Sequence, residues 1–117
     1  MEQEWESKKT GAVKMEQDYA VIRLQGDYDM HSSVRGRRLI LGCLQNCRPT
    51  LVDLNQVAYI DSSGVASLVE GFQLARERKL DFGLVGASHA VLEVLKLARL
   101  DKVFPIYGSV RARLERK

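Results

Sequence analysis

Residues 50–65 read TLVDLNQVAYIDSSGV, and this stretch decides the fold. Its first part, residues 50–54, is a compact apolar run typical of a buried strand, and residues 57–60 continue that apolar character. Apolar side chains then recur at helical spacing, which predicts a helix that begins at residue 62 or 63 and ends near residue 79. A buried strand that leads directly into a helix is typical of an α/β fold.

Further strands and helices are expected on both sides of this stretch. They are a hairpin of strands 11–16 and 19–26, a turn at 26–29, a helix that a serine in 31–33 caps and that ends near Pro49, a strand over 82–86, a helix that Ser88 caps, a short strand over 103–106 and a terminal helix over 109–117. Crossover connections between such elements make most of the sheet parallel, and the hairpin adds one antiparallel pair. We therefore expect a single α/β domain, with a mixed, mostly parallel sheet of about four or five strands and about four helices.

Length and composition indicate one folded unit. With 117 residues, of which 45% are hydrophobic, the chain can bury a core of its own. Residues 1–10 are expected to form a flexible N-terminal tail, and residues 11–117 the folded domain. The formal net charge of +3 comes from intermixed charges of both signs, which indicates an ordinary solvated surface and no nucleic-acid partner.

The expected location is the cytoplasm. Residues 1–11 are polar and lack the apolar run of a secretory signal, and no stretch approaches the roughly 20 apolar residues that span a bilayer. We expect no direct membrane insertion, and a peripheral position at the inner membrane through a partner stays open. Cys43 and Cys47 are expected to share an apolar helix face and to pack in the core, because no second Cys or His pair completes a metal site. No cofactor is expected.

The hydroxyls of Ser62 and Ser63 stand at the expected junction of strand and helix, where backbone N–H groups have no partner within the helix. A phosphate on Ser62 would face the positive end of the helix dipole, so the fold should tolerate it. A simpler interpretation is structural: Asp61 or a serine caps the helix, and Gly64 permits a tight turn. The two interpretations are compatible, and the residues alone leave both open.

Several segments together resemble the signature of the STAS domain family, which sulfate transporters and bacterial anti-sigma factor antagonists share. They are residues 51–54 with Val57, residues 60–64, residues 26–29 and residues 97–104, and the resemblance covers residues 13–107. One departure concerns the helix start, where the family commonly has leucine and glycine and this chain has Val65 and Ala66. That departure bears on how closely a kinase could dock.

The resemblance implies a non-enzymatic anti-sigma factor antagonist whose Ser62 is phosphorylated by a dedicated serine kinase. This kinase is itself the anti-sigma factor, and the unmodified antagonist binds it so that the sigma factor is released. Asp29 and Asp61 are then expected to shape an acidic pocket around the Ser62 hydroxyl, and Gly64 to permit the turn. A phosphoserine carries a charge of about −1.5 to −2, so it would repel a closely packed or acidic partner.

A stripe along the same helix is suited to contact that partner. Its residues are Ser63, Ser67, Glu70 and Leu74, which lie on a face other than the apolar one. Small side chains there, Ala66 and Ser67, would let the backbone of a partner approach. The alternative interpretation, an ordinary solvated helix face, stays open.

Two other functions compete with this one. STAS domains similar to this chain also serve as subunits of bacterial phospholipid ABC transporters, where they bind the ATPase. A serine hydrolase is the third possibility, but a nucleophilic serine needs a general base, and His31 and His89 are the two histidines of the chain. His31 lies near the acidic turn, His89 begins a helix, and the chain has no G-x-S-x-G motif around a serine, so no catalytic residue is expected.

Overall fold

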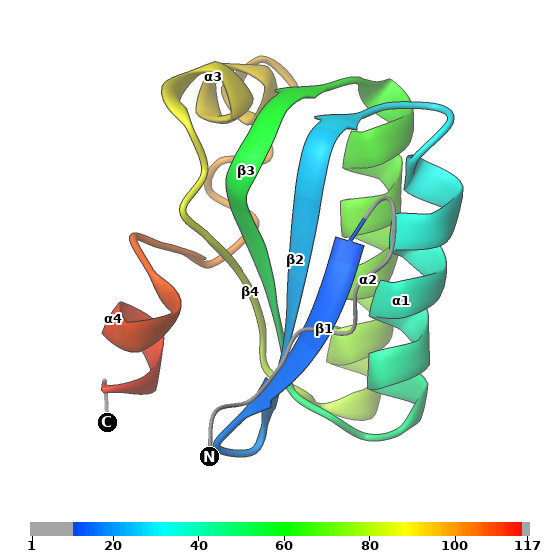
Figure 1. Ribbon diagram of the computed structural model, residues 1–117, viewed down its shortest axis with the longest axis vertical. Helices are drawn as coiled ribbons and strands as arrows, with labels where there is room; N and C mark the ends of the chain where they lie inside the picture. Colours follow the sequence, from blue (N-terminus) through cyan, green and yellow to red (C-terminus); the bar gives the residue numbers. More distant parts are fainter. Residues whose placement is uncertain (1–10, 116–117) are drawn as a thin grey trace.

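The computed structural model describes residues 11–115, and within them strands and helices alternate after an opening hairpin (Figure 1). In chain order the elements are β1 (Gly11–Glu16), β2 (Tyr19–Tyr28), α1 (Ser33–Gln45), β3 (Thr50–Ile60), α2 (Ser62–Arg78), β4 (Phe82–Val85), α3 (His89–Leu97), β5 (Ile106–Tyr107) and α4 (Val110–Leu114). The tail expected over residues 1–10 lies outside the described residues.

The strands form one five-stranded sheet in the order β1-β2-β3-β4-β5. β1 pairs with β2 in antiparallel fashion, whereas β3, β4 and β5 each join the strand before them in parallel. In the middle of the sheet, Ile22, Val52 and Leu84 lie side by side. The prediction of a single α/β domain with a mixed, mostly parallel sheet of four or five strands and about four helices is confirmed.

The core lies between one face of this sheet and the helices α1 and α2, which run next to each other (Figure 1). Ile22 and Leu24 point into it from β2, Ile40 and Leu44 from α1, and Leu68 from α2, and all five are fully buried. Burying this apolar surface is the main force that holds both helices on the sheet. It also fixes where their N-termini lie.

β2 runs farther than the sequence indicated. Residues 26–29 were expected to form a turn, yet β2 continues to Tyr28, which lies beside Ile60 at the end of β3. The prediction of a turn was wrong because the Tyr28 side chain is fully buried, which keeps this segment paired with β3. Gly26 adapts to the irregularity with a φ of +74°, and the register shifts between Gly26 and Asp27.

The end of α1 also differs from expectation. The helix ends at Gln45, and Cys47 follows in the left-handed region with a φ of 60° and an exposed side chain. The prediction that both cysteines pack in the core was therefore wrong for Cys47, because the helical period does not continue past residue 45. Cys43 is half-buried against the core, and burial raises the pKa of its thiol.

The C-terminal part closes the sheet with short elements. The last strand is residues 106–107 rather than 103–106, because Phe104 turns into the core and packs edge-on against Phe72 at a centroid distance of 5.6 Å. The expected terminal helix is the five-residue α4. Its Arg113 pairs with Asp81, whose carboxylate also accepts a hydrogen bond of 2.5 Å from the Tyr19 hydroxyl.

Candidate functional site

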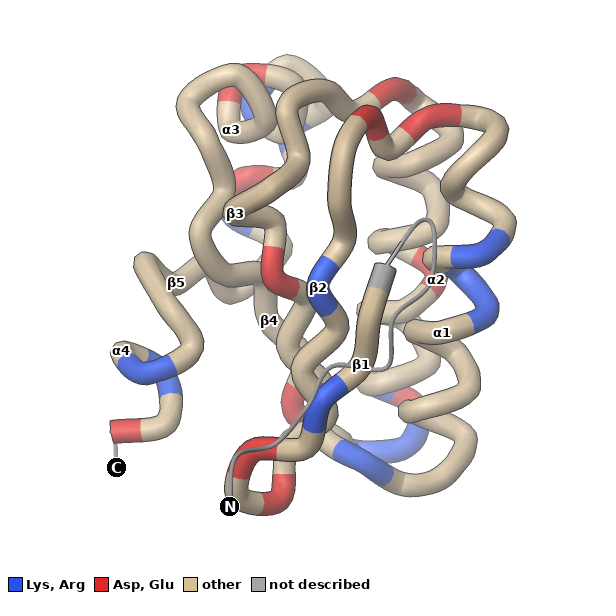
Figure 2. The backbone as a smooth tube through the Cα atoms, in the orientation of Figure 1, with Lys and Arg blue, Asp and Glu red and all other residues tan. Residues whose placement is uncertain are grey.

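The candidate site lies at the end of the sheet where β2 and β3 finish together. The Asp61 backbone N–H donates a hydrogen bond of 3.2 Å to the Tyr28 carbonyl, so the chain leaves both strands at the same level. α1 and α2 begin immediately afterwards, and acidic residues gather at this end of the molecule (Figure 2). The parallel strands thus bring Asp29 and Asp61 to neighbouring positions at one edge.

Asp61 is the N-cap of α2. Its Oδ1 atom accepts hydrogen bonds from the backbone N–H groups of Ser63 at 2.9 Å and Gly64 at 3.1 Å. The structural interpretation of the sequence is therefore correct for Asp61. The hydroxyls of Ser62 and Ser63 take no part in this cap, so the cap does not compete with a modification of either serine.

The Ser62 side chain is exposed in the first turn of α2, whereas that of Ser63 is half-buried. Within residues 11–115 the Ser62 hydroxyl forms no hydrogen bond. Among these residues no hydrogen bond joins it to His31 or His89: the His31 backbone N–H binds Asp29, and the His89 imidazole lies 3.8 Å from Glu93 on α3. The described residues therefore show an exposed hydroxyl that no described side chain binds by a hydrogen bond.

Gly64 allows α2 to start close against the end of β2. A Cβ at this position would lie 2.4 Å from the Tyr28 carbonyl oxygen and 2.9 Å from Cγ1 of Ile60. Real side chains do not approach this closely, so any other residue would force the helix away from the strands. The expected role of Gly64 in the local turn is thus a role in close packing.

Ser67 does not lie on the partner-facing stripe that the sequence indicated. Only 3% of it is exposed, and its Oγ donates to the Gly64 carbonyl at 2.8 Å and lies 2.5 Å from the Tyr28 hydroxyl. We correct that prediction: Ser67 joins α2 to β2 inside the protein. The helical period missed this because the Tyr28 ring, 39 residues away in sequence, covers that side of α2.

Tyr28 is the residue of this site that sequence reasoning undervalued. Its ring is fully buried between α1 and α2, and a Cβ on Gly36 of α1 would lie 2.3 Å from its hydroxyl. Burial raises the pKa of Tyr28 to about 12, and the contact with Ser67 opposes this shift. The signal in the sequence was an aromatic residue between two aspartates, in a segment otherwise typical of a turn.

Asp29 organises the loop before α1. Its Oδ1 accepts hydrogen bonds from the backbone N–H groups of His31 at 3.0 Å and Ser32 at 3.2 Å, and these bonds lower the pKa of the carboxyl group. The Ser32 hydroxyl in turn donates to the Asp27 carbonyl at 2.7 Å. Asp29 is thus held by its own loop, and among the described residues no hydrogen bond joins it to Ser62.

Exposed apolar side chains surround this edge, and the sequence pattern did not single them out. Met30 lies in the loop before α1, Val34 in the first turn of α1 and Tyr59 near the end of β3. Each is more than half exposed. Apolar side chains at the edges of a polar site are typical of a surface that another protein covers.

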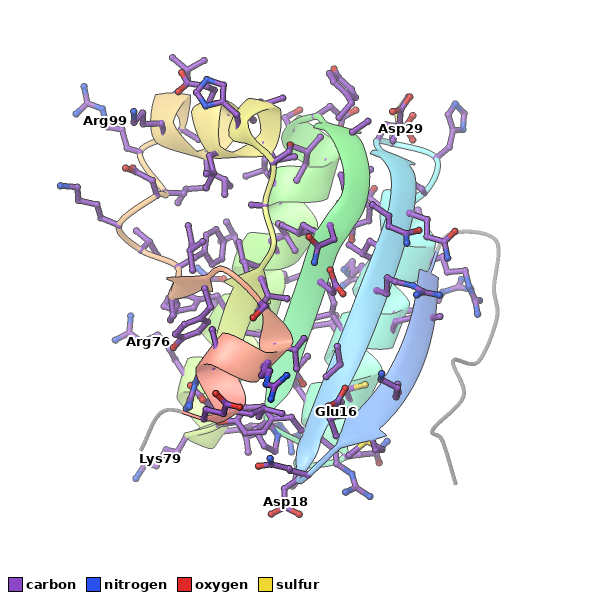
Figure 3. All side chains as sticks on the ribbon, turned by 60° about the vertical axis from the view of Figure 1, so that its left-hand side comes forward. Glu16, Asp18, Asp29, Arg76, Lys79 and Arg99 are labelled. Atoms are coloured by element: carbon purple, nitrogen blue, oxygen red, sulfur yellow. The ribbon has the colours of Figure 1, made fainter. Side chains whose placement is uncertain are left out.

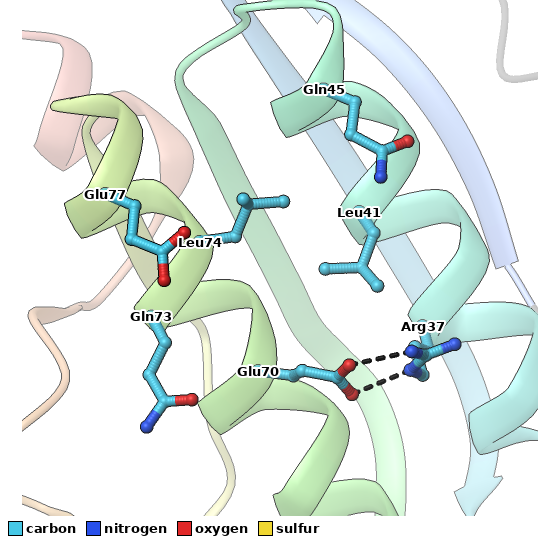
Figure 4. A pocket seen from close by; sticks show the side chains of 7 residues that line it. All are labelled: Arg37, Leu41, Gln45, Glu70, Gln73, Leu74 and Glu77. Atoms are coloured by element: carbon cyan, nitrogen blue, oxygen red, sulfur yellow. Dashed lines mark hydrogen bonds and ion pairs between the residues drawn. The ribbon is translucent and has the colours of Figure 1, made fainter.

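Farther along α2, Ala66 is exposed and Glu70 and Leu74 border a groove of about 340 Å³ between α1 and α2 (Figure 4). Arg37 of α1 binds Glu70 with two hydrogen bonds of 2.7 Å, which lowers the pKa of the Glu70 carboxyl group. Leu74 faces Leu41 across the groove. Of the predicted partner-facing residues, Ala66, Glu70 and Leu74 are thus accessible from outside.

The comparison with known proteins gives a family and a set of similar folds. The model of the STAS domain family matches residues 10–112. A Thermotoga maritima protein described as an anti-sigma factor antagonist is 19% identical with a TM-score of 0.82, over 88% of this chain and 90% of that chain. An anti-sigma-factor antagonist (STAS) domain protein of Planctomyces limnophilus is 25% identical with a TM-score of 0.81, over 90% of this chain and 95% of that chain.

A third similar structure was solved with its protein phosphorylated. It is SpoIIAA, a Bacillus cell fate determinant, with 17% identity and a TM-score of 0.72 over 91% of this chain and 97% of that chain. At 17% identity the similarity shows a shared fold. The phosphorylation is a property of SpoIIAA. Among residues 11–115, no helix is long and apolar enough to cross a bilayer.

Proposed function

The chain belongs to the STAS domain family, and on that premise we propose that it is an anti-sigma factor antagonist, a binding protein whose affinity for a serine kinase of the anti-sigma type is switched by phosphorylation of Ser62. One observation carries the proposal. The Ser62 hydroxyl is exposed and unbonded in the first turn of α2, while Asp61 supplies the cap. A phosphate added there breaks no hydrogen bond of the folded protein.

The cap also determines where such a phosphate would point. The N–H groups of Ser63 and Gly64 already bind the Asp61 carboxylate, and the N–H of Val65 binds the Asp61 carbonyl at 2.9 Å. These donors are therefore not free to fold a phosphate back onto the helix, and the Asp61 charge repels it. The phosphate would gain a modest attraction from the helix dipole and extend toward solvent.

An outward phosphate acts on whatever covers this edge. Met30, Val34 and Tyr59 offer apolar contacts at the same edge as Ser62, and a partner that covers this edge would also have to remove water from a dianion. A loss of about 3 kcal/mol already weakens binding by roughly a hundredfold. We expect the kinase to bind the unmodified protein and to release the phosphorylated one, with no change of fold in either step.

Affinity capture tests the proposal and its competitor together. Wild-type protein and Ser62→Asp are immobilised and exposed to an extract of the source cells. The proposal expects a kinase with a histidine-kinase-like ATP-binding domain on wild type and its loss on Ser62→Asp. Capture of an ABC transporter ATPase and permease, equally by both proteins, would instead identify a transporter subunit and overturn the proposal.

A further inference from the structure

A second surface at the same end of the molecule carries exposed apolar side chains, this time among cations. It comprises residues 96–103, the last turn of α3 and the turn that follows, and we call it the α3 tip. Leu97 is 84% exposed and Val103 is 43% exposed. Figure 1 shows α3 at the end of the sheet where β2 and β3 finish.

The backbone and the core hold these side chains outward. Leu95 on one side of the tip is fully buried, and Phe104 on the other is almost so. Between them the chain turns through Arg99, whose φ is 61°, and the Leu100 N–H closes the turn by donating to the Leu95 carbonyl at 2.8 Å. This is the pattern of a helix C-terminus closed by a left-handed residue. Leu97 is therefore exposed in the folded state and not through fraying.

The charged residues within the tip are mainly positive, whereas the acidic Asp29 and Asp61 of the same end precede α1 and α2. Lys96 lies 3.8 Å from Glu93 on the preceding turn, and Asp101 is half-buried. Arg99 and Lys102 are exposed and form no ion pair with any residue in 11–115. In Figure 3 the Arg99 side chain points away from the body of the protein. Two cations without an ion pair among the described residues thus follow the exposed leucine within the tip.

We propose that the α3 tip rests on an anionic lipid membrane, with Arg99 and Lys102 at the headgroups and Leu97 in the interfacial layer. Exposed apolar side chains in the same turn as exposed cations suit the interface of an anionic membrane. The tip lies apart from the two grooves on α2 and between α1 and α2, so what it offers a partner is its exposed cations, which complement an anionic surface. The contact is peripheral, and it depends on neither candidate function proposed above.

Vesicle sedimentation tests the proposal with a matched pair of variants. Arg99→Glu and Lys79→Glu make the same charge change at exposed helix-terminal residues with nearly equal φ values of 61° and 58°. Figure 3 shows the two residues at opposite ends of the molecule. The probes are vesicles that contain phosphatidylglycerol, and vesicles of phosphatidylcholine alone as the uncharged reference.

Each cation near an anionic bilayer is worth about 1 kcal/mol, or about five-fold in binding, so Arg99→Glu should weaken binding at least about ten-fold. Lys79→Glu should stay within about two-fold, and Leu97→Ser should weaken binding about five-fold without changing the partner captured through Ser62. Added salt should weaken binding by the wild type. No binding of the wild type to anionic vesicles, or equal losses for Arg99→Glu and Lys79→Glu, would overturn the proposal. If the wild type binds no vesicles but captures an acidic protein that Arg99→Glu does not capture, the tip is the binding site of that protein instead.

Discussion

The Tyr28 hydroxyl lies 2.5 Å from the Ser67 hydroxyl, and this contact joins the end of β2 to α2 just beyond the turn that carries Ser62. Ser67 also bonds the Gly64 carbonyl at 2.8 Å, so the two hydroxyls and this carbonyl form one buried hydrogen-bond network. The contact is buried, which means that the position of the α2 N-terminus depends on a residue from another part of the chain. The exposed Ser62 is therefore held in place by a buried contact beneath it.

Removing the Tyr28 hydroxyl should cost stability. Tyr28→Phe deletes a buried hydrogen bond and leaves the Ser67 hydroxyl with one partner fewer, so the free energy of unfolding should fall by about 1 kcal/mol or somewhat more. Tyr59→Phe is the control, because that side chain is more than half exposed, and its effect should stay within about 0.5 kcal/mol. Urea denaturation measures both. Equal stability of the two variants would contradict this role of Tyr28.

The same residue predicts a loss of stability at high pH. The pKa of Tyr28 is raised to about 12 in the folded state from an ordinary value of 10.0. The unfolded chain ionises first, so this contribution is complete below about pH 10 and is lost as the pH rises from 10 to 12. Tyr19 has a pKa of about 12 for a similar reason, burial aided by Asp81, so the wild-type curve contains both residues.

Comparison of the wild type with Tyr28→Phe isolates the contribution of Tyr28 to this pH dependence. The variant should lose stability less steeply between pH 10 and 12, and the slope that remains is due to Tyr19 and other groups. Urea midpoints at several pH values in this interval provide the measurement. Parallel curves for wild type and variant would show that Tyr28 titrates no differently in the two states.

Two glycines in helices should respond oppositely to alanine. Gly64→Ala places a Cβ 2.4 Å from the Tyr28 carbonyl oxygen, and we expect a loss of about 1–3 kcal/mol from the strain. A Cβ on Gly42 of α1 would meet no atom within 4 Å, so Gly42→Ala should be neutral or stabilising by up to about 1 kcal/mol. Thermal unfolding measures both, and similar shifts would argue against close packing at Gly64.

Substitutions at Asp61 and Ser62 should show that the first residue caps α2 and that the second does not support the fold. Asp61→Ala removes the acceptor of two backbone N–H groups and should cost about 1 kcal/mol, within a range of about 0.5–2. Ser62→Ala and Ser62→Asp alter an exposed, unbonded side chain, and each should change stability by less than about 0.5 kcal/mol. A large loss of stability in Ser62→Ala would mean that the hydroxyl supports the fold.

The apolar side chains around Ser62 should contribute to partner binding without contributing to stability. Tyr59→Ala is expected to weaken capture of the partner by at least about five-fold, because large aromatic side chains contribute a large share of the binding energy of interfaces. Val103→Ala, also partly exposed but on the α3 tip, is the matched control and should leave capture unchanged. Surface plasmon resonance measures the affinities. Equal affinities of the wild type and Tyr59→Ala would show that Tyr59 is not part of the partner-binding surface.

Local patterns in the sequence were enough to predict the sheet and the main helices. The run at residues 50–60 and the apolar period after Ser62 correspond to β3 and α2, and Ser88 caps α3 by accepting from the Val91 N–H at 3.2 Å. These features depend on residues near one another in sequence. The exposed position of Ser62 follows from the same local pattern.

The errors occurred where contacts between distant residues decide the structure. Residues 26–28 have the composition of a turn, yet the burial of Tyr28 draws them into β2. Ser67 shares a helix face with exposed residues, yet that same tyrosine covers it. Cys47 continues the apolar period of α1, yet the helix has already ended at Gln45. A helical period by itself shows neither where a helix stops nor what packs against each side.

The central claim is that a phosphate on Ser62 changes binding and leaves the fold intact. Its most direct test is a calorimetric titration of the captured kinase with unmodified protein and with protein phosphorylated at Ser62, together with the Tm of each form. We predict a Kd that rises at least about a hundredfold and a Tm that stays the same. An unchanged Kd for the phosphorylated protein, or unfolding of that form, would contradict the claim.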